Sequence, residues 1–285
     1  MKANTAIGVV GAIACLLVAV ILEGGQPASL LNIPALLIVV GGTGMATFAS
    51  TTMAGVKNIP KLYKKSFGGP GVDPAAAIDQ MVGLAEKARR DGLLALEDEI
   101  AKVDDAFMKT GIQLVVDGTD SDVVRGIMQS EMDGMSARHR TGWSLFTTAG
   151  GFAPTLGILG TVLSLVHVLE NLSSPGTLGP LIAGAFLATL YGVGSANLIF
   201  LPIANKLKEL SGIELVYREM LLEAILSIQA GDNPRMLREK LETFVEPSAR
   251  NTGRAAAPAA ATPAAPAAPA EEPVVAEPAE LVGAA

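Results

Sequence analysis

The sequence predicts an all-α membrane protein with four transmembrane helices and a helical cytoplasmic domain between the second and the third. Half of the 285 residues are hydrophobic and only 17% are charged, whereas a soluble domain is about one quarter charged. The chain also contains four long, apolar, charge-free runs, and a membrane-spanning helix needs about 20 mostly apolar residues. The surplus apolar side chains are expected to face lipid, which argues against a soluble enzyme.

The four spans are predicted at residues 3–22, 33–53, 146–169 and 179–204. The first run follows Lys2 and so resembles a secretory signal. Its apolar stretch, however, is longer than the usual signal core of about 7 to 15 residues, and a second span follows at once. We therefore expect the first span to be retained in the mature protein.

The basic residues predict the orientation of the spans. Apart from Lys2, every Lys and Arg of the 21 lies within residues 57–140 or 206–254. The short connections 24–32 and 171–178 contain none. By the positive-inside rule, both termini and the central domain, residues 54–141, are cytoplasmic. The chain is thus predicted to be a multi-pass membrane protein with both termini in the cytoplasm.

The cytoplasmic segments have helical patterns and capping signals. Asp73 and Pro74 are a good N-cap and first residue for a helix, and Gly92 is a signal for a helix C-cap. Between the second and third spans, helices are predicted over 75–90, 93–108 and 121–139, the last continuing into the third span.

After the fourth span, residues 205–246 are also predicted to be helical. One helix is expected over 206–229, ended by Gly231, and a short one from Asn233 to Phe244. Residues 247–285 are rich in Ala and Pro, which cannot bury a core, and are predicted to be a disordered tail.

Several kinds of chemistry are disfavoured by composition. Cys15 is the single cysteine, and the two histidines, His139 and His167, are far apart in the chain, so no metal site or cofactor is expected. Basic residues do not alternate with aromatic ones, which argues against a nucleic-acid partner. The glycines do not form a phosphate-binding loop.

The centres of the four predicted spans contain no ionisable side chain. No Asp, Glu, Lys or Arg lies there, and Glu23, His167 and Glu170 are near the outer ends. Ionisable residues inside a membrane usually mark a functional site. If ions cross here, the titrating carboxylate must come from another chain.

Small and hydroxyl-bearing residues form stripes on the third and fourth spans. The third carries Pro154, Gly157, Thr161 and Ser164, and the fourth carries Ala185, Thr189, Gly192 and Ala196, with Ala188, Tyr191 and Ser195 on the adjoining stripe. Two interpretations fit: close packing of membrane helices, or a hydroxyl-lined ion route. Pro154 and Pro202 similarly fit either fixed helix geometry or a hinge.

Charged residues gather on both sides of Gly92. Arg89 and Arg90 precede it, and Glu97 to Glu99 follow it. Such a run is usually a solvated face whose ion pairs add little stability. The alternative is a docking surface that attracts a charged partner.

Five segments resemble the MotA/PomA family of flagellar stator subunits, within the MotA/TolQ/ExbB proton channel superfamily. They are residues 88–97, 111–118, 154–161, 188–192 and 197–207, and the match extends from the first span to about Phe244. The resemblance implies a pentameric ring of A subunits around a pair of MotB-like B subunits. The B subunit is anchored to peptidoglycan and supplies a membrane aspartate. Such a stator converts ion flow into rotation of the flagellum and is not an enzyme.

The resemblance also implies roles for individual residues. Arg89 and Glu97, with Arg90 beside them, match charged positions that contact the rotor protein FliG. Pro154 and Pro202 match prolines implicated in coupling conformational change to ion passage. Thr161 and Thr189 match hydroxyl positions near the aspartate and the ion route, with Ala188 and Tyr191 alongside. Ion occupancy would change how the aspartate binds the A-subunit wall, and the ring would step by one subunit.

The sequence leaves alternatives open for the identity of the transported ion and for the functional class of the protein. Sodium-driven members tend to have two adjacent threonines before Leu-Tyr-Gly, and here Ala188 occupies the first position. Fewer oxygen ligands favour a proton, whereas Thr161 favours sodium. An ExbB/TolQ-like energiser with three spans is the main alternative function. A structural scaffold or a self-sufficient transporter is another, although a transporter normally has its own intramembrane ionisable residue or broken helices.

Overall fold

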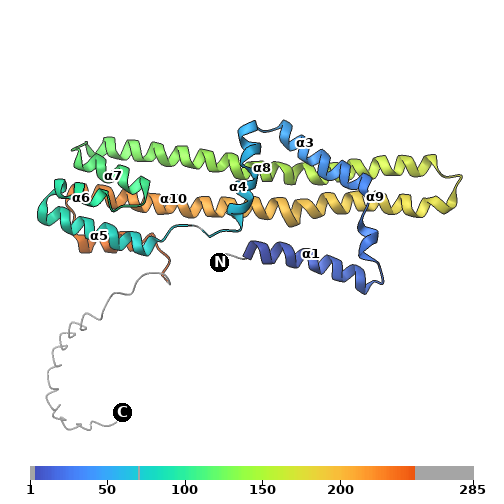
Figure 1. Ribbon diagram of the computed structural model, residues 1–285, viewed down its shortest axis with the longest axis horizontal. Helices are drawn as coiled ribbons and strands as arrows, with labels where there is room; N and C mark the ends of the chain where they lie inside the picture. The colour runs from blue at the N-terminus through green and yellow to red at the C-terminus, as the bar shows by residue number, and fades with distance from the viewer. Residues whose placement is uncertain (1–3, 70, 248–285) are drawn as a thin grey trace, which may run out of the picture. The chain divides into compact units, whose positions relative to one another are not determined.

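The computed structural model describes residues 4–69 and 71–247, all within a compact unit that covers residues 1–249. Helices are the only regular elements in these residues (Figure 1). Three of the described helices are long and apolar enough to cross a membrane: Thr5–Leu22, a part of Ser121–Glu170, and a part of Pro175–Ala230. Ile33–Ala49 is an apolar helix of shorter length. The predicted tail, residues 247–285, lies outside the described residues except for Pro247.

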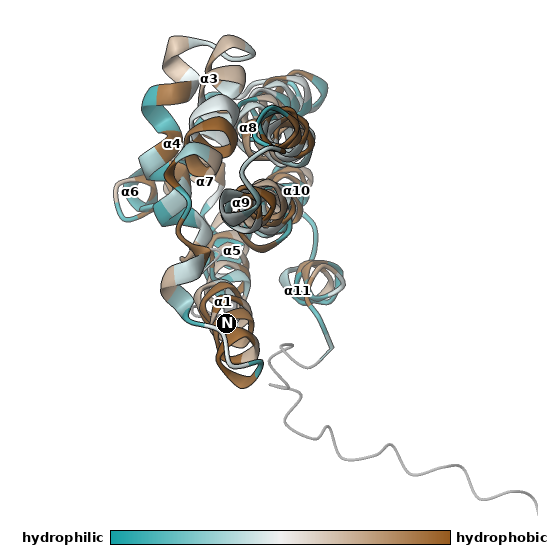
Figure 2. Ribbon diagram, turned by 90° about the vertical axis from the view of Figure 1, so that its right-hand side faces the viewer, coloured by the Kyte–Doolittle hydropathy of each residue, from teal (hydrophilic) through white to brown (hydrophobic). Residues whose placement is uncertain are grey.

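Helix α1 (Asn4–Leu22) is largely hydrophobic, as its mostly brown ribbon in Figure 2 shows, and most of its large side chains are exposed. Ile7, Val10 and Leu22 are 68%, 66% and 82% exposed. In water, such exposure would cost about 25 cal/mol for every Å² of apolar surface. A helix that is hydrophobic all round suits lipid or a protein interface instead.

The segment of the second predicted span is helical but ends early. It consists of α2 (Ile33–Leu36), a π-helical turn η2 (Leu37–Gly41) and α3 (Gly42–Ala49), after the short 3-10 helix η1 (Pro27–Leu30). The prediction extended this helix to Met53. The chain instead turns at Ser50, whose hydroxyl donates to the Thr47 carbonyl, and Thr52 is extended and caps the next helix, α4 (Met53–Ser66). Hydroxyl side chains compete for backbone hydrogen bonds and so favour a helix break here.

Residues 54–141, the predicted cytoplasmic domain, contain one helix that is confirmed and another that is corrected. Helix α5 (Pro74–Asp91) begins as predicted, because the Asp73 carboxylate accepts from the Ala76 N–H, and it ends at Gly92 with φ of 87°. The single helix predicted over 93–108 is wrong. The chain forms a 3-10 turn η3 (Leu93–Leu96), one turn of helix α6 (Glu97–Ile100), and, after a break, α7 (Ala106–Val116).

The physical reason for this break lies between Ala101 and Asp105. Val103 leaves the helical path and is buried in the main hydrophobic core. Asp105 then has extended backbone angles, and its carboxylate accepts from the Met108 N–H at 3.0 Å, which starts α7. The apolar spacing is compatible with one helix, but burial of Val103 and the Asp105 cap favour two.

The longest elements form an antiparallel helical hairpin. As predicted, helix α8 (Ser121–Glu170) runs without interruption from the domain that contains α5 to α7 through the third expected span. The return limb is α9 (Pro175–Ser195), a π-helical turn η4 (Ala196–Phe200) and α10 (Leu201–Ala230), which lie beside α8 (Figure 1). Gly231, with φ of 74°, ends α10 as predicted, and α11 (Pro234–Glu242) follows.

The main core lies at the end of the hairpin where α8 begins and α10 ends. Helices α5, α7 and α11 pack there against the ends of α8 and α10, around fully buried Phe107, Met128, Leu221 and Ile225. A smaller cluster of Phe146, Ile203, Ala204 and Leu207 lies beneath α4. This core therefore holds one end of the hairpin, and the other end contains the predicted membrane site.

Candidate functional site

Helices α8 and α9 approach so closely that only glycine fits at two positions. A Cβ atom on Gly192 would lie 2.6 Å from the Ala153 carbonyl oxygen and 2.9 Å from the Gly157 Cα. A Cβ atom on Gly157 would lie 3.0 Å from the Ala188 carbonyl oxygen. The obstructing atoms belong to the backbone, which cannot move aside easily. The small residues of the two stripes thus bring the two helix backbones into contact, as in other membrane helix pairs.

Beside this contact, the side chains of Thr161 and Thr189 meet across the interface. Their hydroxyl oxygens lie 2.5 Å apart. The Thr161 oxygen is also 3.0 Å from the Gly157 carbonyl and 3.1 Å from the Ala185 carbonyl. Since one hydroxyl has one hydrogen, Thr161 can donate to a carbonyl while it accepts from Thr189. The two side chains are half-buried, and each hydroxyl has a hydrogen-bond partner in the other. The Thr189 hydroxyl hydrogen can turn to a new acceptor without breaking a hydrogen bond to the backbone.

The other two residues predicted for the ion route contact the second apolar segment or the residues just before it. Ala188 is completely buried and packs with Ala35 and Val39 of the second apolar segment. The Tyr191 hydroxyl donates to the Leu30 carbonyl and accepts from the Asn32 N–H at 3.0 Å. The structure thus brings Thr161 and Thr189 together, and it places Ala188 and Tyr191 where they anchor α9 to the start of α2.

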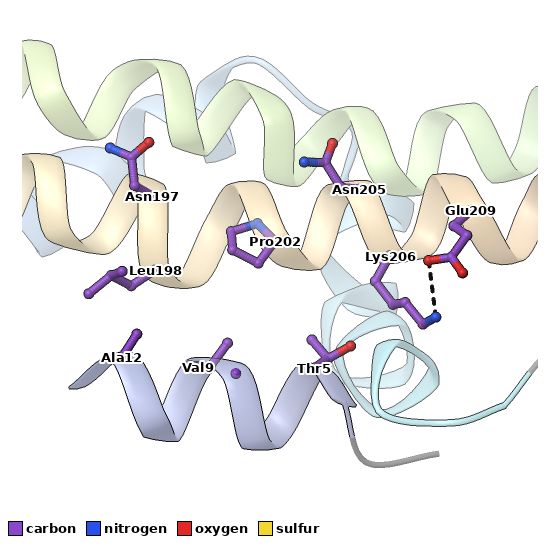
Figure 3. A pocket seen from close by; sticks show the side chains of 10 residues that line it. Thr5, Val9, Ala12, Asn197, Leu198, Pro202, Asn205, Lys206 and Glu209 are labelled. Carbon is purple, nitrogen blue, oxygen red and sulfur yellow. Dashed lines mark hydrogen bonds and ion pairs between the residues drawn. The ribbon is translucent and has the colours of Figure 1, made fainter. Parts of the chain in front are cut away.

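The two prolines lie in different local structures. Pro154 is inside α8, which continues through it. Pro202 is the second residue of α10, directly after the π-helical turn η4. Proline has no N–H and its ring clashes with the carbonyl four residues earlier, so the wider turn accommodates it. Pro202 also lines a cavity of about 510 Å³ between α10 and α1, opposite Thr5 and Val9 (Figure 3).

The charged residues around Gly92 form an exposed joint between α5 and α6. The Arg90 guanidinium donates two hydrogen bonds of 3.0 Å to the Asp91 carboxylate. This pairing raises the pKa of Arg90 and lowers the pKa of Asp91. Arg89 and Glu97 are exposed, and neither forms an ion pair with any described residue. They are therefore free to contact a partner, whereas Arg90 is already paired.

A second ion-pair network holds the joint together. The Glu99 carboxylate accepts from Lys87 of α5 at 2.8 Å and from Lys102 at 2.9 Å. These two hydrogen bonds lower the pKa of Glu99. The network connects the end of α5 to the segment after α6, which fixes the spacing between Arg89 and Glu97.

The membrane half offers hydroxyls but no acid. The sequence has no charged residue between Arg140 and Glu170 or between Glu170 and Lys206. In the part of the chain that the structure describes, no group of His, Cys, Asp and Glu is placed to hold a metal ion. The α8–α9 contact around Gly157 and Gly192 can donate and accept hydrogen bonds, but the sequence places no Asp, Glu, His, Lys or Arg in that stretch of either helix.

Comparisons with known proteins identify the family. Residues 99–220 match the MotA/TolQ/ExbB proton channel family. Motility protein A of Borreliella burgdorferi is 40% identical over 220 residues, which cover 77% of this chain and 85% of that protein. The chain belongs to the MotA/PomA branch of the MotA/TolQ/ExbB family. Chemotaxis protein PomA of Vibrio alginolyticus is 34% identical over 88% of this chain and 98% of its own length.

A solved structure agrees with this assignment. The flagellar MotAB stator complex from Bacillus subtilis contains a chain with 36% identity and a TM-score of 0.81, and the match covers 87% of this chain and 98% of that one. The family resemblance inferred from the motifs is confirmed. The MotA-like fold of this chain is therefore preserved over nearly the whole length of its relative.

Some features of this MotA/PomA-family member had no clear sequence signal. The Tyr191 hydrogen bonds to Leu30 and Asn32 join positions about 160 residues apart, so sequence spacing could not reveal them. Leu94, at the tip of the joint, is 74% exposed and adds an apolar contact to the charged surface. The available signal for this tip was a leucine two residues after the glycine that ends α5.

Proposed function

We propose that this chain is the A subunit of a flagellar stator. With a single-span MotB-like B subunit, it forms an ion channel that converts ion-motive force into torque on the rotor. Family membership and the likeness to a chain of the MotAB stator complex support this function. The A subunits assemble as a pentameric ring, and the chain transports an ion and performs no bond-making chemistry.

The observation that carries the proposal is the acid-free α8–α9 interface with its paired hydroxyls. A channel of this kind needs a titrating group, and the spans do not supply one. A B-subunit aspartate beside Thr189 would complete the site. When ionised, it accepts a hydrogen bond from the Thr189 hydroxyl, which turns away from Thr161. When neutralised by an ion, it releases that bond. The ionised and the neutralised aspartate therefore bind the A-subunit surface at Thr189 with different affinity, as a ring that moves in steps requires.

A proton is the favoured ion. A dehydrated sodium ion needs several oxygen ligands, and position 188 offers a buried methyl group in place of a hydroxyl. Thr161 and Thr189 already bond to each other, and Thr161 also bonds to backbone carbonyls. Motility measured with and without sodium over a range of pH tests this assignment. Swimming that requires sodium would contradict it.

The proposed topology places the torque-generating surface in the cytoplasm. Both termini and the domain that contains Arg89 and Glu97 are on the cytoplasmic side of the inner membrane, and the 171–178 connection is outside. The exposed, unpaired Arg89 and Glu97 then contact the rotor protein FliG. Cysteine labelling at positions 26 and 173 from outside intact cells tests the orientation, since both positions should react before lysis.

The test of the whole proposal is recruitment of a B subunit. Full-length chain expressed with a B-type single-span protein should co-purify with it, and loss of the chain should stop swimming. A stable ring that recruits no B-type protein, and whose deletion leaves swimming intact, would refute the proposal. An ExbB/TolQ-like role is less well supported, because the relatives that match at nearly full length are motility proteins.

A further inference from the structure

A polar cavity lies where the second apolar segment ends and α4 begins. It has a volume of about 330 Å³ and is formed by the turn Ser50–Thr52 together with one face of α8 from Arg140 to Thr148. Six of its eight lining residues are Ser or Thr, and one is an arginine. This composition is unusual so close to a predicted span, and the mechanism proposed above does not use it.

The cavity has more donors than acceptors. Arg140 forms no ion pair or hydrogen bond with any described residue, and the hydroxyls of Thr51 and Thr148 likewise have no partner there. The Thr52 oxygen accepts from the Gly55 N–H at 3.3 Å, which leaves its hydrogen free. The remaining hydroxyls, of Ser50, Thr141 and Ser144, donate to carbonyls of their own helices. A guanidinium with free hydroxyl donors is suited to an oxyanion, above all a phosphate.

The surroundings are positive. The sequence has no acidic residue between Glu23 and Asp73 or between Asp133 and Glu170, the two regions that form the cavity. An adjoining cavity of about 420 Å³ shares Thr52 and Thr141 and is lined by Lys61, Lys65 and Arg138. Lys65 is paired with Glu214 at 3.4 Å, whereas Lys61 has no ion pair among the described residues. A phosphate in the first cavity would therefore also be attracted by the second.

The position of the cavity identifies the source of the phosphate. It lies at the end of α3, whose Met45 and Phe48 are 69% and 43% exposed and would contact acyl chains. The basic helix α4 begins at its edge and carries Lys57, Lys61, Lys64 and Lys65 with no acid, a pattern typical of helices at an anionic membrane surface. We propose that this cavity binds the phosphate headgroup of an anionic phospholipid in the inner leaflet. The leaflet assignment rests on the proposed topology.

Trp143 makes the proposal measurable. It is the only tryptophan in the chain and lies on α8 within the Arg140–Thr148 segment. Bromine atoms on acyl chains quench tryptophan fluorescence at short range. The full-length protein is reconstituted in phosphatidylcholine vesicles, and part of the lipid is replaced by brominated phosphatidylglycerol or brominated phosphatidylcholine. We expect the wild-type protein to prefer phosphatidylglycerol, with a relative binding constant of about 10.

Two variants test the site, each with a matched control. Arg140→Gln should lower the preference about fivefold, which corresponds to about 1 kcal/mol. Arg125→Gln removes an exposed arginine from the cytoplasmic part of α8 and should leave the preference unchanged. Thr148→Val removes a donor without changing charge and should lower the preference about twofold. Its control is Thr155→Val, whose hydroxyl bonds to the Phe152 carbonyl of its own helix.

The outcomes separate the possible occupants. Equal quenching by both brominated lipids, or an unchanged preference in both Arg140→Gln and Thr148→Val, would overturn the proposal. Displacement of phosphatidylglycerol by millimolar inorganic phosphate would show that the cavity binds a soluble anion, and this too would overturn it. The assay needs neither the B subunit nor ion flux. Its failure would therefore be distinguishable from failure of the proposed stator function.

Discussion

The hydroxyl oxygens of Thr161 and Thr189 lie 2.5 Å apart across the interface between α8 and α9. This contact stands beside the Gly157–Gly192 backbone contact, so the hydroxyls have little freedom to separate unless the helices do. The packing and ion-route interpretations of the stripes are therefore compatible. The glycines set the distance between the helices, and that distance brings the threonines into hydrogen-bond range.

Replacing Thr189 with valine should distinguish a role in helix packing from a role in ion passage. Valine has a similar shape but cannot donate, so ion flux with the B subunit present should fall strongly. Stability should fall by only about 0.6 kcal/mol, a typical value for a hydrogen bond between membrane helices. Acidification of cells that express the channel measures the flux. The control is Thr155→Val, which alters an exposed hydroxyl of α8. Normal flux in Thr189→Val would leave only the packing interpretation.

Replacing Gly192 with alanine should damage the interface itself. The added Cβ would lie 2.6 Å from the Ala153 carbonyl oxygen, so the helices must separate. Overpacking of this kind costs about 1 to 3 kcal/mol. The melting temperature of the purified protein should fall. Gly194→Ala is the matched control, because no atom lies within 4 Å of the place that its Cβ would take, and it should not lower the melting temperature. An equal melting temperature for both variants would contradict the close-contact argument.

Local signals in the sequence account for much of the fold. Asp73 predicts the start of α5, Gly231 predicts the end of α10, and both act through backbone groups of adjacent residues. The break before α7 was not predictable in the same way. Leu93 to Met108 has helical spacing, and only the tertiary core shows that Val103 is buried outside a helix.

The candidate site was likewise predictable only in part from the sequence. Stripe spacing placed Thr161 on the small-residue face of the third span and Thr189 on that of the fourth, because helical periodicity is a local property. The structure shows that these two faces meet. Ala188 and Tyr191 share that stripe region but face α2, and this depends on how the second apolar segment crosses α9. A sequence pattern gives the face of a helix, but it does not give the identity of the neighbour.

The Glu99 network should make stability depend on pH. Hydrogen bonds from Lys87 and Lys102 lower the pKa of Glu99 in the folded protein. Between the two pKa values of Glu99, the unfolded protein therefore binds more protons than the folded protein does. The network stabilises the folded protein fully at pH values above the unfolded pKa. This stabilisation is lost as the pH falls through the lower, folded pKa.

Glu99→Gln should therefore lower the melting temperature at neutral pH and have little effect below the folded pKa. Glu97→Gln is the control on the same helical turn, because Glu97 has no ion pair with any described residue. Melting temperatures measured from pH 7 to acid pH compare the two. A constant difference between Glu99→Gln and the wild-type protein over this range would contradict the assignment.

Charge reversal at the joint tests whether it contacts the rotor. Arg89→Glu or Glu97→Lys should impair torque, because each reverses an exposed charge that is free to bind a partner. Stability should change by no more than about 0.5 kcal/mol, as is usual for surface substitutions, and the ring should still assemble. Swimming speed and size-exclusion chromatography measure the two effects. The control is Arg125→Glu, another exposed arginine on a different helix. Partial recovery of swimming when a rotor charge is reversed in turn would support direct contact. Unchanged swimming in both Arg89→Glu and Glu97→Lys would show that the joint is a solvated surface. The rotor contact would then have to lie on another part of the chain.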